Sequence, residues 1–207
     1  YNFTVVDDPT PFIAVNVDND TVVCEGGSTA LYVHHIDGGI EGAAYEYQWY
    51  RNGIILAGET NPTLTTDATL VPGNYEYQVI VTLDGVACDG ASNTITVPVM
   101  ALPVVTIADA ANVCVGGQVT MTATVDETYG ATVTYQWNRD GQPLDGANQS
   151  TYTTDANLSV GSYNYTVTVI NPLSGCQATS GAVAANVVAD PSVTILGAAD
   201  VCVGGTI

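Results

Sequence analysis

An internal repeat constrains the fold of this chain more than any other feature. Residues 47–88 align with residues 135–176 without a gap, at a constant offset of 88 positions. The pattern VCxGG also recurs, at residues 23–27, 113–117 and 201–205. Self-similarity at such a period is typical of tandem arrays, in which each repeat is a structural unit. The sequence therefore predicts related domains in series.

The repeat period also predicts the domain boundaries. One complete repeat is expected at residues 9–100 and a second at residues 101–190. Residues 191–207 copy the start of the second repeat, so they are expected to be the first strands of a third, truncated repeat. Residues 1–8 resemble the last strand before each proline linker and are expected to close a preceding domain.

Each repeat is predicted to be all-β. Thr, Val, Ile and Tyr alternate with polar residues at 75–83, 118–126 and 163–170, which turns one face of each strand inward. Asn52-Gly53 and Asp140-Gly141 are pairs that form tight hairpin turns. About seven strands in roughly 90 residues is the size of a sandwich of two sheets.

The charge of the chain limits its partners. Two arginines and no lysine accompany 21 Asp and Glu residues, which gives a formal net charge of -19. Such a surface repels nucleic acid and anionic lipid, so neither is expected as a partner. No run of about 18 apolar residues is present, so no membrane insertion is expected in this segment.

Five cysteines occupy fixed places in the repeat. We expect one disulfide within each domain, Cys24 with Cys88 and Cys114 with Cys176, rather than metal binding or buried free thiols. The sequence has no CxxC motif and no His near these cysteines, which argues against a metal site. Cys202 is expected to pair with a cysteine beyond residue 207. Disulfides indicate an oxidising compartment, namely periplasm, cell surface or medium.

Four aromatic residues are assigned to the framework. Trp49 and Trp137 lie mid-strand with a Tyr two residues before each, which favours a core position over a surface that stacks on sugars. Tyr77 and Tyr165 follow the turn that starts a long strand. We interpret them as corner tyrosines, whose hydroxyl groups cap a loop carbonyl.

The two arginines are expected to form structural ion pairs. Arg51 and Arg139 share the Trp face of their strands, and Asp67 and Asp155 stand at one fixed place before the Tyr-rich strand. An inward guanidinium without a partner is costly, so we expect Arg51 to pair with Asp67 and Arg139 with Asp155. Binding of a ligand is the less favoured role.

The sequence offers few candidates for metal ligands. His34 and His35 are adjacent on a predicted strand and should point to opposite faces, which argues against a shared metal site. Carboxylates near the repeat boundaries are candidates for Ca²⁺, although solvated surface is the favoured interpretation, and no other cofactor is expected. These carboxylates are Asp7, Asp8, Asp109 and Asp190.

Catalytic motifs are missing from the sequence. It contains no GxSxG, no HExxH and no phosphate-binding loop. The residues that recur in both repeats are Cys, Trp, Tyr, Gly and Pro, which build a fold. We therefore expect no enzymatic activity.

The order VCxGG, YQWxRxG, TTDAxL, GxYxYxV and GC resembles the immunoglobulin-like and PKD-like repeats of very long secreted surface proteins of Bacteroidota, including gliding-motility adhesins of the SprB type. The resemblance covers almost the whole chain. It implies tandem immunoglobulin-like β-sandwiches, export by type IX secretion, a bacterial cell-surface location and a role in adhesion or gliding. Thr21, in Asp-Thr-Val, resembles the O-glycosylation acceptors of this bacterial group.

Two functions remain open. In the first, the repeats are spacers in a stalk or surface filament, and their partners are neighbouring repeats of the same chain. In the second, each repeat is a module that binds polysaccharide or another surface protein, which requires an exposed aromatic cluster. The aromatic residues that could supply one do not recur between repeats, so the spacer is favoured. They are Tyr32, Tyr45, Tyr50 and Tyr129.

Overall fold

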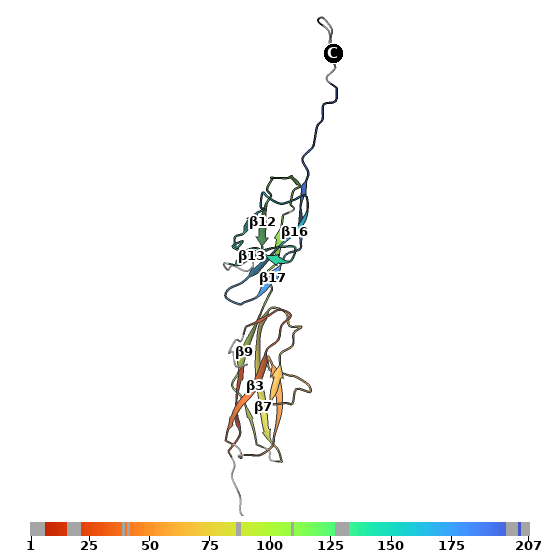
Figure 1. Cartoon of the computed structure of the whole chain (residues 1–207). Helices are drawn as coiled ribbons and strands as arrows, with labels where there is room; N and C mark the ends of the chain where they lie inside the picture. Colours follow the sequence, from red (N-terminus) through yellow and green to blue (C-terminus); the bar gives the residue numbers. More distant parts are fainter. Residues whose placement is uncertain are drawn as a thin grey trace, which may run out of the picture. The chain divides into compact units, whose positions relative to one another are not determined.

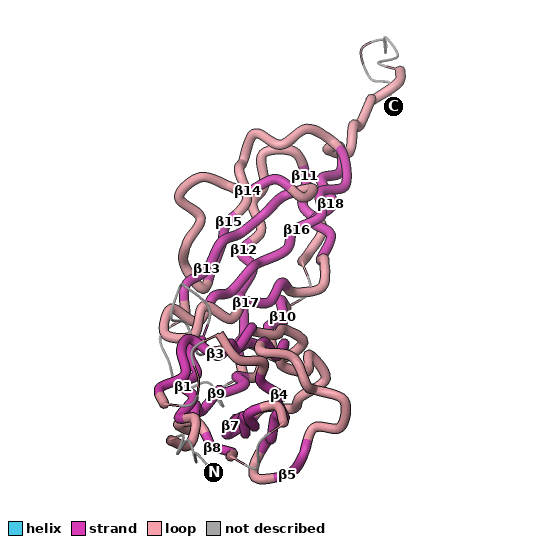
Figure 2. The backbone as a smooth tube through the Cα atoms, turned by 90° about the horizontal axis from the view of Figure 1, so that it is seen from below, coloured by secondary structure: helices cyan, strands magenta, loops and turns pink. Residues whose placement is uncertain are grey.

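The structure is a computed structural model that describes residues 7–15, 22–38, 40, 42–85, 88–108, 110–126, 133–197 and 203. Every regular element in these ranges is a strand, as Figure 2 shows. The chain divides into two compact units. The first contains Tyr1–Val104, Asp126–Thr134 and Val169–Ala178, and the second contains Val105–Val125, Tyr135–Thr168 and Thr179–Ile207.

The described part of the first repeat contains nine strands in two sheets. Figure 1 labels β3, β7 and β9 among them. The smaller sheet has the order β1-β3-β6, and the larger has the order β2-β9-β7-β4-β5, with β8 also paired to β7. The short strand β2 runs parallel to β9, whereas β4 and β9 run antiparallel to β7. The strands are β1 (Thr10–Val15), β2 (Val23–Cys24), β3 (Ala30–Asp37), β4 (Tyr45–Arg51), β5 (Ile54–Ile55), β6 (Thr63–Thr65), β7 (Gly73–Leu83), β8 (Asp89–Ala91) and β9 (Ile95–Met100).

The core of the first repeat lies between these two sheets. Alternation along β7 buries Tyr77, Val79 and Val81, as the sequence pattern predicts. They pack in one cluster with residues of both sheets, namely Ile13, Val23, Leu31, Trp49, Leu64 and Val97. Burying a large apolar side chain stabilises the fold by roughly 1.5–3 kcal/mol, so this cluster drives the closure of the sandwich.

The second repeat has the same strand pairing. Its sheets have the orders β10-β12-β15 and β11-β18-β16-β13-β14, with β17 also paired to β16. Its buried residues include Met121, Trp137, Tyr165, Val167 and Val187. The strands are β10 (Val105–Ile107), β11 (Val113–Cys114), β12 (Thr120–Val125), β13 (Thr134–Arg139), β14 (Gln142–Pro143), β15 (Thr151–Thr153), β16 (Gly161–Ile170), β17 (Gln177–Thr179) and β18 (Val183–Val188). The fold is therefore a tandem pair of immunoglobulin-like β-sandwiches.

The predicted hairpin turns are confirmed. Asn52 and Asp140 have φ angles of 51° and 50°, and the glycines that follow them have φ angles of 73° and 79°. Two successive residues with positive φ define the turn that matches the twist of a two-residue hairpin. The turn joins β4 to β5 in the first repeat and β13 to β14 in the second.

A glutamine follows the same plan in both repeats. The side-chain amide of Gln48 donates hydrogen bonds to the carbonyl oxygens of Trp49, at 3.1 Å, and Leu56, at 2.7 Å. Gln136 donates to the carbonyl oxygens of Trp137 and Leu144, both at 2.9 Å. Each glutamine thereby fastens the segment after the hairpin to the Trp-bearing strand.

The predicted boundary segments are only partly described. Strand pairing stays within residues 10–100 and within residues 105–188 in the part of the chain that the structure describes. Residues 7 and 8, and residues 191–197, are in no strand. Residues 1–6 and most of 198–207 lie outside the described residues, so the closing strand at 1–8 and the third repeat at 191–207 stay predictions.

Candidate functional site

A disulfide joins the two repeats. It links Cys24, at the end of β2, to Cys176, which lies between β16 and β17, and their Cα atoms are 5.5 Å apart. Cys88 and Cys114 are free thiols. The predicted pairs, Cys24 with Cys88 and Cys114 with Cys176, are therefore wrong, as is the expectation of one disulfide within each domain. Because the segment Val169–Ala178 groups with the first compact unit, the bond lies inside that unit.

The geometry of a single repeat excludes the predicted pairing. Cys24 lies beside Met100, at the end of β9 that pairs with the start of β7. Cys88 lies at the other end of β7, where its carbonyl oxygen accepts a hydrogen bond from the amide of Leu83. The 11 residues of β7 span roughly 33 Å at about 3.3 Å per residue. A disulfide requires Cα atoms about 4.4–6.8 Å apart, so the two cysteines of one repeat cannot meet.

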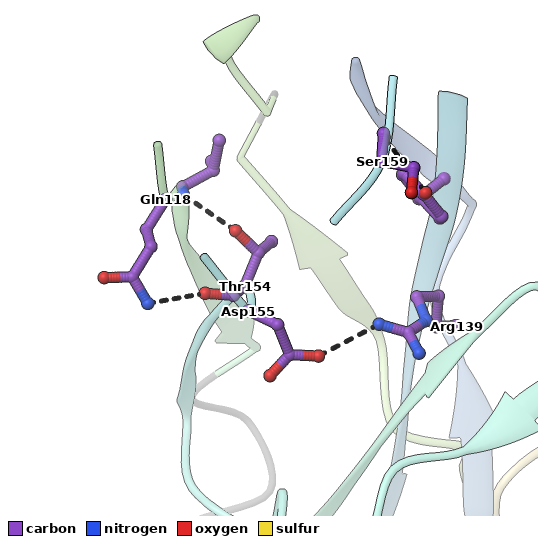
Figure 3. Close-up of polar contacts among 7 residues, drawn as sticks. Gln118, Arg139, Thr154, Asp155 and Ser159 are labelled. Carbon is purple, nitrogen blue, oxygen red and sulfur yellow. Dashed lines mark hydrogen bonds and ion pairs between the residues drawn. The ribbon is translucent and has the colours of Figure 1, made fainter. Parts of the chain in front are cut away.

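The arginines lie beside their expected aspartates. The Nη1 atom of Arg139 donates a hydrogen bond to Oδ2 of Asp155 at 3.1 Å, as Figure 3 shows. The corresponding distance between Arg51 and Asp67 is 3.9 Å. Each guanidinium also lies over a tyrosine ring, 5.8 Å from the ring centroid in the first repeat and 5.9 Å in the second. The cluster recurs in both repeats, as expected of a structural element.

Hydrogen bonds within its own turn stabilise the charged form of Asp67. The backbone amide and the hydroxyl of Thr69 donate to Oδ1 of Asp67 at 2.8 and 2.7 Å. These two hydrogen bonds lower the pKa of Asp67, and Arg51 adds a smaller effect in the same direction. The carboxylate is thus committed to stabilising the turn before β7 and is unsuited to accepting a proton near neutral pH.

The corner tyrosines stand two residues before the predicted ones. Tyr75 donates its hydroxyl hydrogen to the carbonyl oxygen of Val71 at 2.9 Å, and Tyr163 donates to that of Ser159 at 3.1 Å. The hydroxyl groups of Tyr77 and Tyr165 are buried and make no hydrogen bond of good geometry among the described residues. Their assignment as corner tyrosines is therefore wrong, and they are core residues.

Burial determines how these core tyrosines titrate. It raises the pKa of Tyr77 and of Tyr165, although the neighbouring arginine opposes the shift in each repeat. The pKa of Arg139 is raised chiefly by the hydroxyl of Tyr165, with a further contribution from Asp155. That hydroxyl makes no hydrogen bond of good geometry, so its effect on Arg139 is electrostatic. These shifts keep both groups in their ordinary protonation states.

The tryptophans occupy the core, where they cannot stack on a sugar. Trp49 and Trp137 are both 0% exposed. Their Nε1 groups donate to the carbonyl oxygens of Asn61, at 2.8 Å, and Gln149, at 2.9 Å. Each ring therefore fills the sandwich while its polar atom fastens a loop, which is the arrangement that a buried indole requires.

A groove beside β4 lies on the described surface of the first repeat. Its volume is about 520 Å³, and its lining residues are Tyr45, Glu46, Tyr47, Gln48, Thr60, Ile80 and Thr82. Burial raises the pKa of Tyr47, and Tyr45 adds to the shift. The offset of 88 places Val133 and Thr134 where the first repeat has Tyr45 and Glu46, whereas Tyr47 and Gln48 recur as Tyr135 and Gln136, so only part of the lining recurs in the second repeat. Sequence reasoning named Tyr45 as an exposed candidate and Tyr47 as a core-face residue, and both side chains are partly buried and pack against the core cluster.

The two histidines share one side of their strand, contrary to prediction. Phe12 faces His35 and Ile13 faces Val33, so His34 has no counterpart on β1 and forms a bulge. A bulge interrupts the alternation of side chains. As a result the Nδ1 atoms of His34 and His35 are 2.9 Å apart, and the ring of His35 stacks on Phe12 with centroids 5.2 Å apart. This exposed aromatic cluster belongs to the first repeat, since β10 and β12 pair without such a shift.

The Ca²⁺ candidates do not come together in the described ranges. There, no group of three or more His, Cys, Asp or Glu side chains is placed to hold a metal ion. Asp7, Asp8 and Asp190 are exposed. Asp109, Thr21, Tyr129 and Cys202 lie outside the described residues, so the proposed roles of these four positions stay predictions. The same ranges contain no helix long and apolar enough to span a membrane.

Comparisons with known proteins find similarity in structure alone. No protein-family model and no curated protein matches the chain. The fibronectin(III)-like modules of Clostridium thermocellum CbhA align at 13% identity and a TM-score of 0.46, over 86% of this chain and 95% of that one. Three N-terminal domains of the bacteriophage RB49 outer capsid protein Hoc align at 17% identity and a TM-score of 0.42, over 86% of this chain and 59% of that one. The Bacteroides ovatus protein SGBP-B, solved with a mixed-linkage heptasaccharide, aligns at 15% identity and a TM-score of 0.34, over 87% of this chain and 48% of that one. Likenesses of this size do not transfer a function to the chain.

Proposed function

We propose that the chain is a non-catalytic stalk segment, in which tandem sandwiches hold another part of a long secreted surface protein away from a bacterial cell. The observation that carries the proposal is the disulfide between Cys24 and Cys176, which ties one repeat to the next. A bond between repeats adds nothing to the binding surface of either repeat. It does limit how far the repeats separate when the chain is pulled.

The features that the two repeats share support the same function. Each repeat has a buried Trp, a Tyr that caps the turn before its long strand, and an Arg beside an Asp. All three stabilise the sandwich. The full lining of the groove and the histidine cluster, by contrast, belong to the first repeat. Selection on a spacer acts on the residues that stabilise the sandwich, and these are the residues that recur in both repeats.

The setting of the stalk follows from chemistry and from the repeat pattern. A disulfide persists in an oxidising compartment, and this supports a location outside the cytoplasm. The net charge of -19 keeps neighbouring copies apart on a crowded surface. Together with the resemblance to Bacteroidota surface adhesins, these properties support a role in attachment or gliding at the cell surface.

Single-molecule force spectroscopy on a chain held at its two ends tests the stalk. The 152 residues that separate Cys24 from Cys176 correspond to about 530 Å of extended chain, at roughly 3.5 Å per residue. We expect this length to stay locked while the bond is intact and to be released after reduction with dithiothreitol. Cys88→Ser, which removes a free thiol, is the matched control and should behave as the parent. Release of the full length before reduction would contradict the proposal.

A second candidate function is favoured by the groove beside β4. Two tyrosines, a carboxylate, an amide and two threonine hydroxyls line it, and this mixture of aromatic and hydrogen-bonding groups suits a polysaccharide. Affinity electrophoresis in gels that contain soluble β-glucan or bacterial exopolysaccharide measures such binding. Retardation that Tyr47→Ala and Glu46→Gln abolish, and that Tyr135→Ala in the second repeat leaves intact, would support a binding module. Unretarded migration of the parent chain in both gels would reject it for those polysaccharides.

A further inference from the structure

The two free thiols occupy the same places in their repeats as the two bonded cysteines. Cys114 ends β11 as Cys24 ends β2, and Cys88 precedes β8 as Cys176 precedes β17. One strand-end cysteine and one hairpin cysteine are therefore bonded, and one of each kind is free. Each free thiol therefore has the position of a bonded cysteine but lacks a partner of the other kind among the described residues.

The strand-end cysteines are presented in the same way. Cys24 pairs with Met100 in a parallel ladder, and Cys114 pairs likewise with Val188. Their carbonyl oxygens accept hydrogen bonds from the amides of Gly27, at 2.8 Å, and Gly117, at 2.9 Å. The intervening glycine has a φ angle of 84° in both turns, a conformation that glycine adopts readily. Cys114 is exposed, so its thiol is open to a partner.

The hairpin cysteines are also held alike. The carbonyl oxygens of Cys88 and Cys176 each accept a hydrogen bond of 2.9 Å, from the amides of Leu83 and Asn171 respectively. Beyond each cysteine a serine hydroxyl accepts a bond of 3.0 Å from the long strand, in the pairs Val79 with Ser92 and Val167 with Ser180. The backbone around the strand-end cysteine and the backbone around the hairpin cysteine are therefore the same in both repeats.

The direction of the observed bond specifies the missing partners. It runs from the strand-end cysteine of one repeat to the hairpin cysteine of the next. Cys88 and Cys114 have the reverse order, since the hairpin cysteine belongs to the earlier repeat, and so they are not partners for each other. Each needs a further repeat, which Cys88 would find before its own and Cys114 after its own.

We propose that every junction between repeats of this type carries the same disulfide. In a chain with further repeats, Cys114 bonds to the hairpin cysteine of the following repeat and Cys88 bonds to the strand-end cysteine of the preceding one. Each bond forms from two thiols, which lose two protons and two electrons to a disulfide oxidant that is itself reduced to two thiols. This inference deepens the proposed stalk function and rests on it, because it describes how stalk repeats are joined.

An extended chain tests the inference directly. Residues 191–207 repeat residues 103–119, so adding a copy of residues 120–190 after Ile207 completes a third repeat with the second repeat's own sequence. The extended chain is refolded with oxidised and reduced glutathione, free thiols are alkylated, and the unreduced protein is digested at Asp and Glu for mass spectrometry. We expect two linked peptide pairs, Cys24 with Cys176 and Cys114 with the added copy of Cys176. Cys88 and Cys202 should be alkylated.

The controls assign the bond. Replacing the added hairpin cysteine by Ser should leave Cys114 alkylated while the bond between Cys24 and Cys176 persists, which also reports that the first junction has folded. A bond from the added cysteine to Cys202, or bonds between separate chains, would overturn the inference. So would an alkylated Cys114 in the extended chain.

The original 207-residue chain supplies a test that does not depend on folding of the added repeat. We expect Cys24 and Cys176 to resist alkylation and Cys88 and Cys114 to be alkylated. A bond between Cys24 and Cys88, or between Cys88 and Cys114, would overturn the inference. The stalk function fails on different grounds: with every bond mapped as expected, retardation of the chain in the polysaccharide gels that Tyr47→Ala abolishes would replace the stalk by a binding module.

Discussion

The hydroxyl of Tyr75 donates a hydrogen bond of 2.9 Å to the carbonyl oxygen of Val71, and this bond closes the turn that leads into β7. The hydroxyl of Tyr77, two residues on, is buried without such a bond. Tyr75→Phe should therefore lower the free energy of unfolding by about 1 kcal/mol, and Tyr77→Phe should change it less or raise it slightly. Urea denaturation followed by tryptophan fluorescence measures both. A larger loss of unfolding free energy for Tyr77→Phe than for Tyr75→Phe would show that Tyr77 is the corner tyrosine after all.

The disulfide should be the largest single contribution to stability that can be removed chemically. Closing a loop of 152 residues restrains the unfolded chain by about 5 kcal/mol in the chain-entropy model, which is an upper figure. Replacing Cys24 and Cys176 together by Ser should shift the urea midpoint strongly downward. Replacing Cys88 and Cys114 together should leave the midpoint close to that of the parent chain, because both are free thiols. Equal shifts for the two double variants would argue against the bond.

Gly90 should not tolerate a side chain. A Cβ atom at this position of β8 would overlap the carbonyl group of Pro9. Gly90→Ala should therefore force the backbone apart and lower the free energy of unfolding by about 1–3 kcal/mol. Gly181→Ala is the matched control, because a Cβ atom there meets no atom within 4 Å. A thermal unfolding midpoint unchanged by Gly90→Ala would show that the segment leading into β1 does not pass β8 this closely.

The turn around Asp67 should make the first repeat sensitive to acid. Its pKa is lowered below the ordinary value of 3.8, chiefly by the two hydrogen bonds from Thr69. A carboxylate with a depressed pKa in the folded state stabilises that state above the unfolded pKa, and the stabilisation is lost as the pH falls through the folded pKa. Urea midpoints measured from neutral pH down to about pH 2 should fall less steeply below about pH 4 for Asp67→Asn than for the parent chain.

Thr69→Val separates the two hydrogen bonds in this turn. It removes the hydroxyl donor and keeps the backbone amide, so its acid dependence should lie between those of Asp67→Asn and the parent chain. If all three chains lose stability in parallel below pH 4, then Asp67 is not the group responsible.

The parts of the structure that the sequence predicts are those encoded by spacing. The repeat offset, the alternation along β7 and the Asn-Gly and Asp-Gly pairs each determine local geometry, so the sandwich strands and hairpins follow from them. The proximity of Arg51 to Asp67 and of Arg139 to Asp155 follows similarly, because few cations are available for many carboxylates.

The features that sequence reasoning missed depend on where strands end and shift. Cys24 and Cys88 belong to one repeat, but the length of β7 keeps them apart. His34 and His35 were expected on opposite faces, and a single unpaired residue in β3 brings their rings together. No residue pattern marks the bulge, and the separation of the two cysteines follows only once the pairing of β2 with β9 and of β9 with β7 is known.

The amide of Gln48 has a consequence for an array of similar sandwiches. By donating to the carbonyl oxygens of Trp49, on β4, and Leu56, directly after β5, it engages backbone acceptors near the edge of its sheet, and Gln136 does the same in the second repeat. Tandem copies hold nearly identical strands at high local concentration, where an unprotected margin invites domain swapping and aggregation. A glutamine that occupies these groups internally leaves fewer free backbone acceptors with which a strand of a neighbouring repeat could pair.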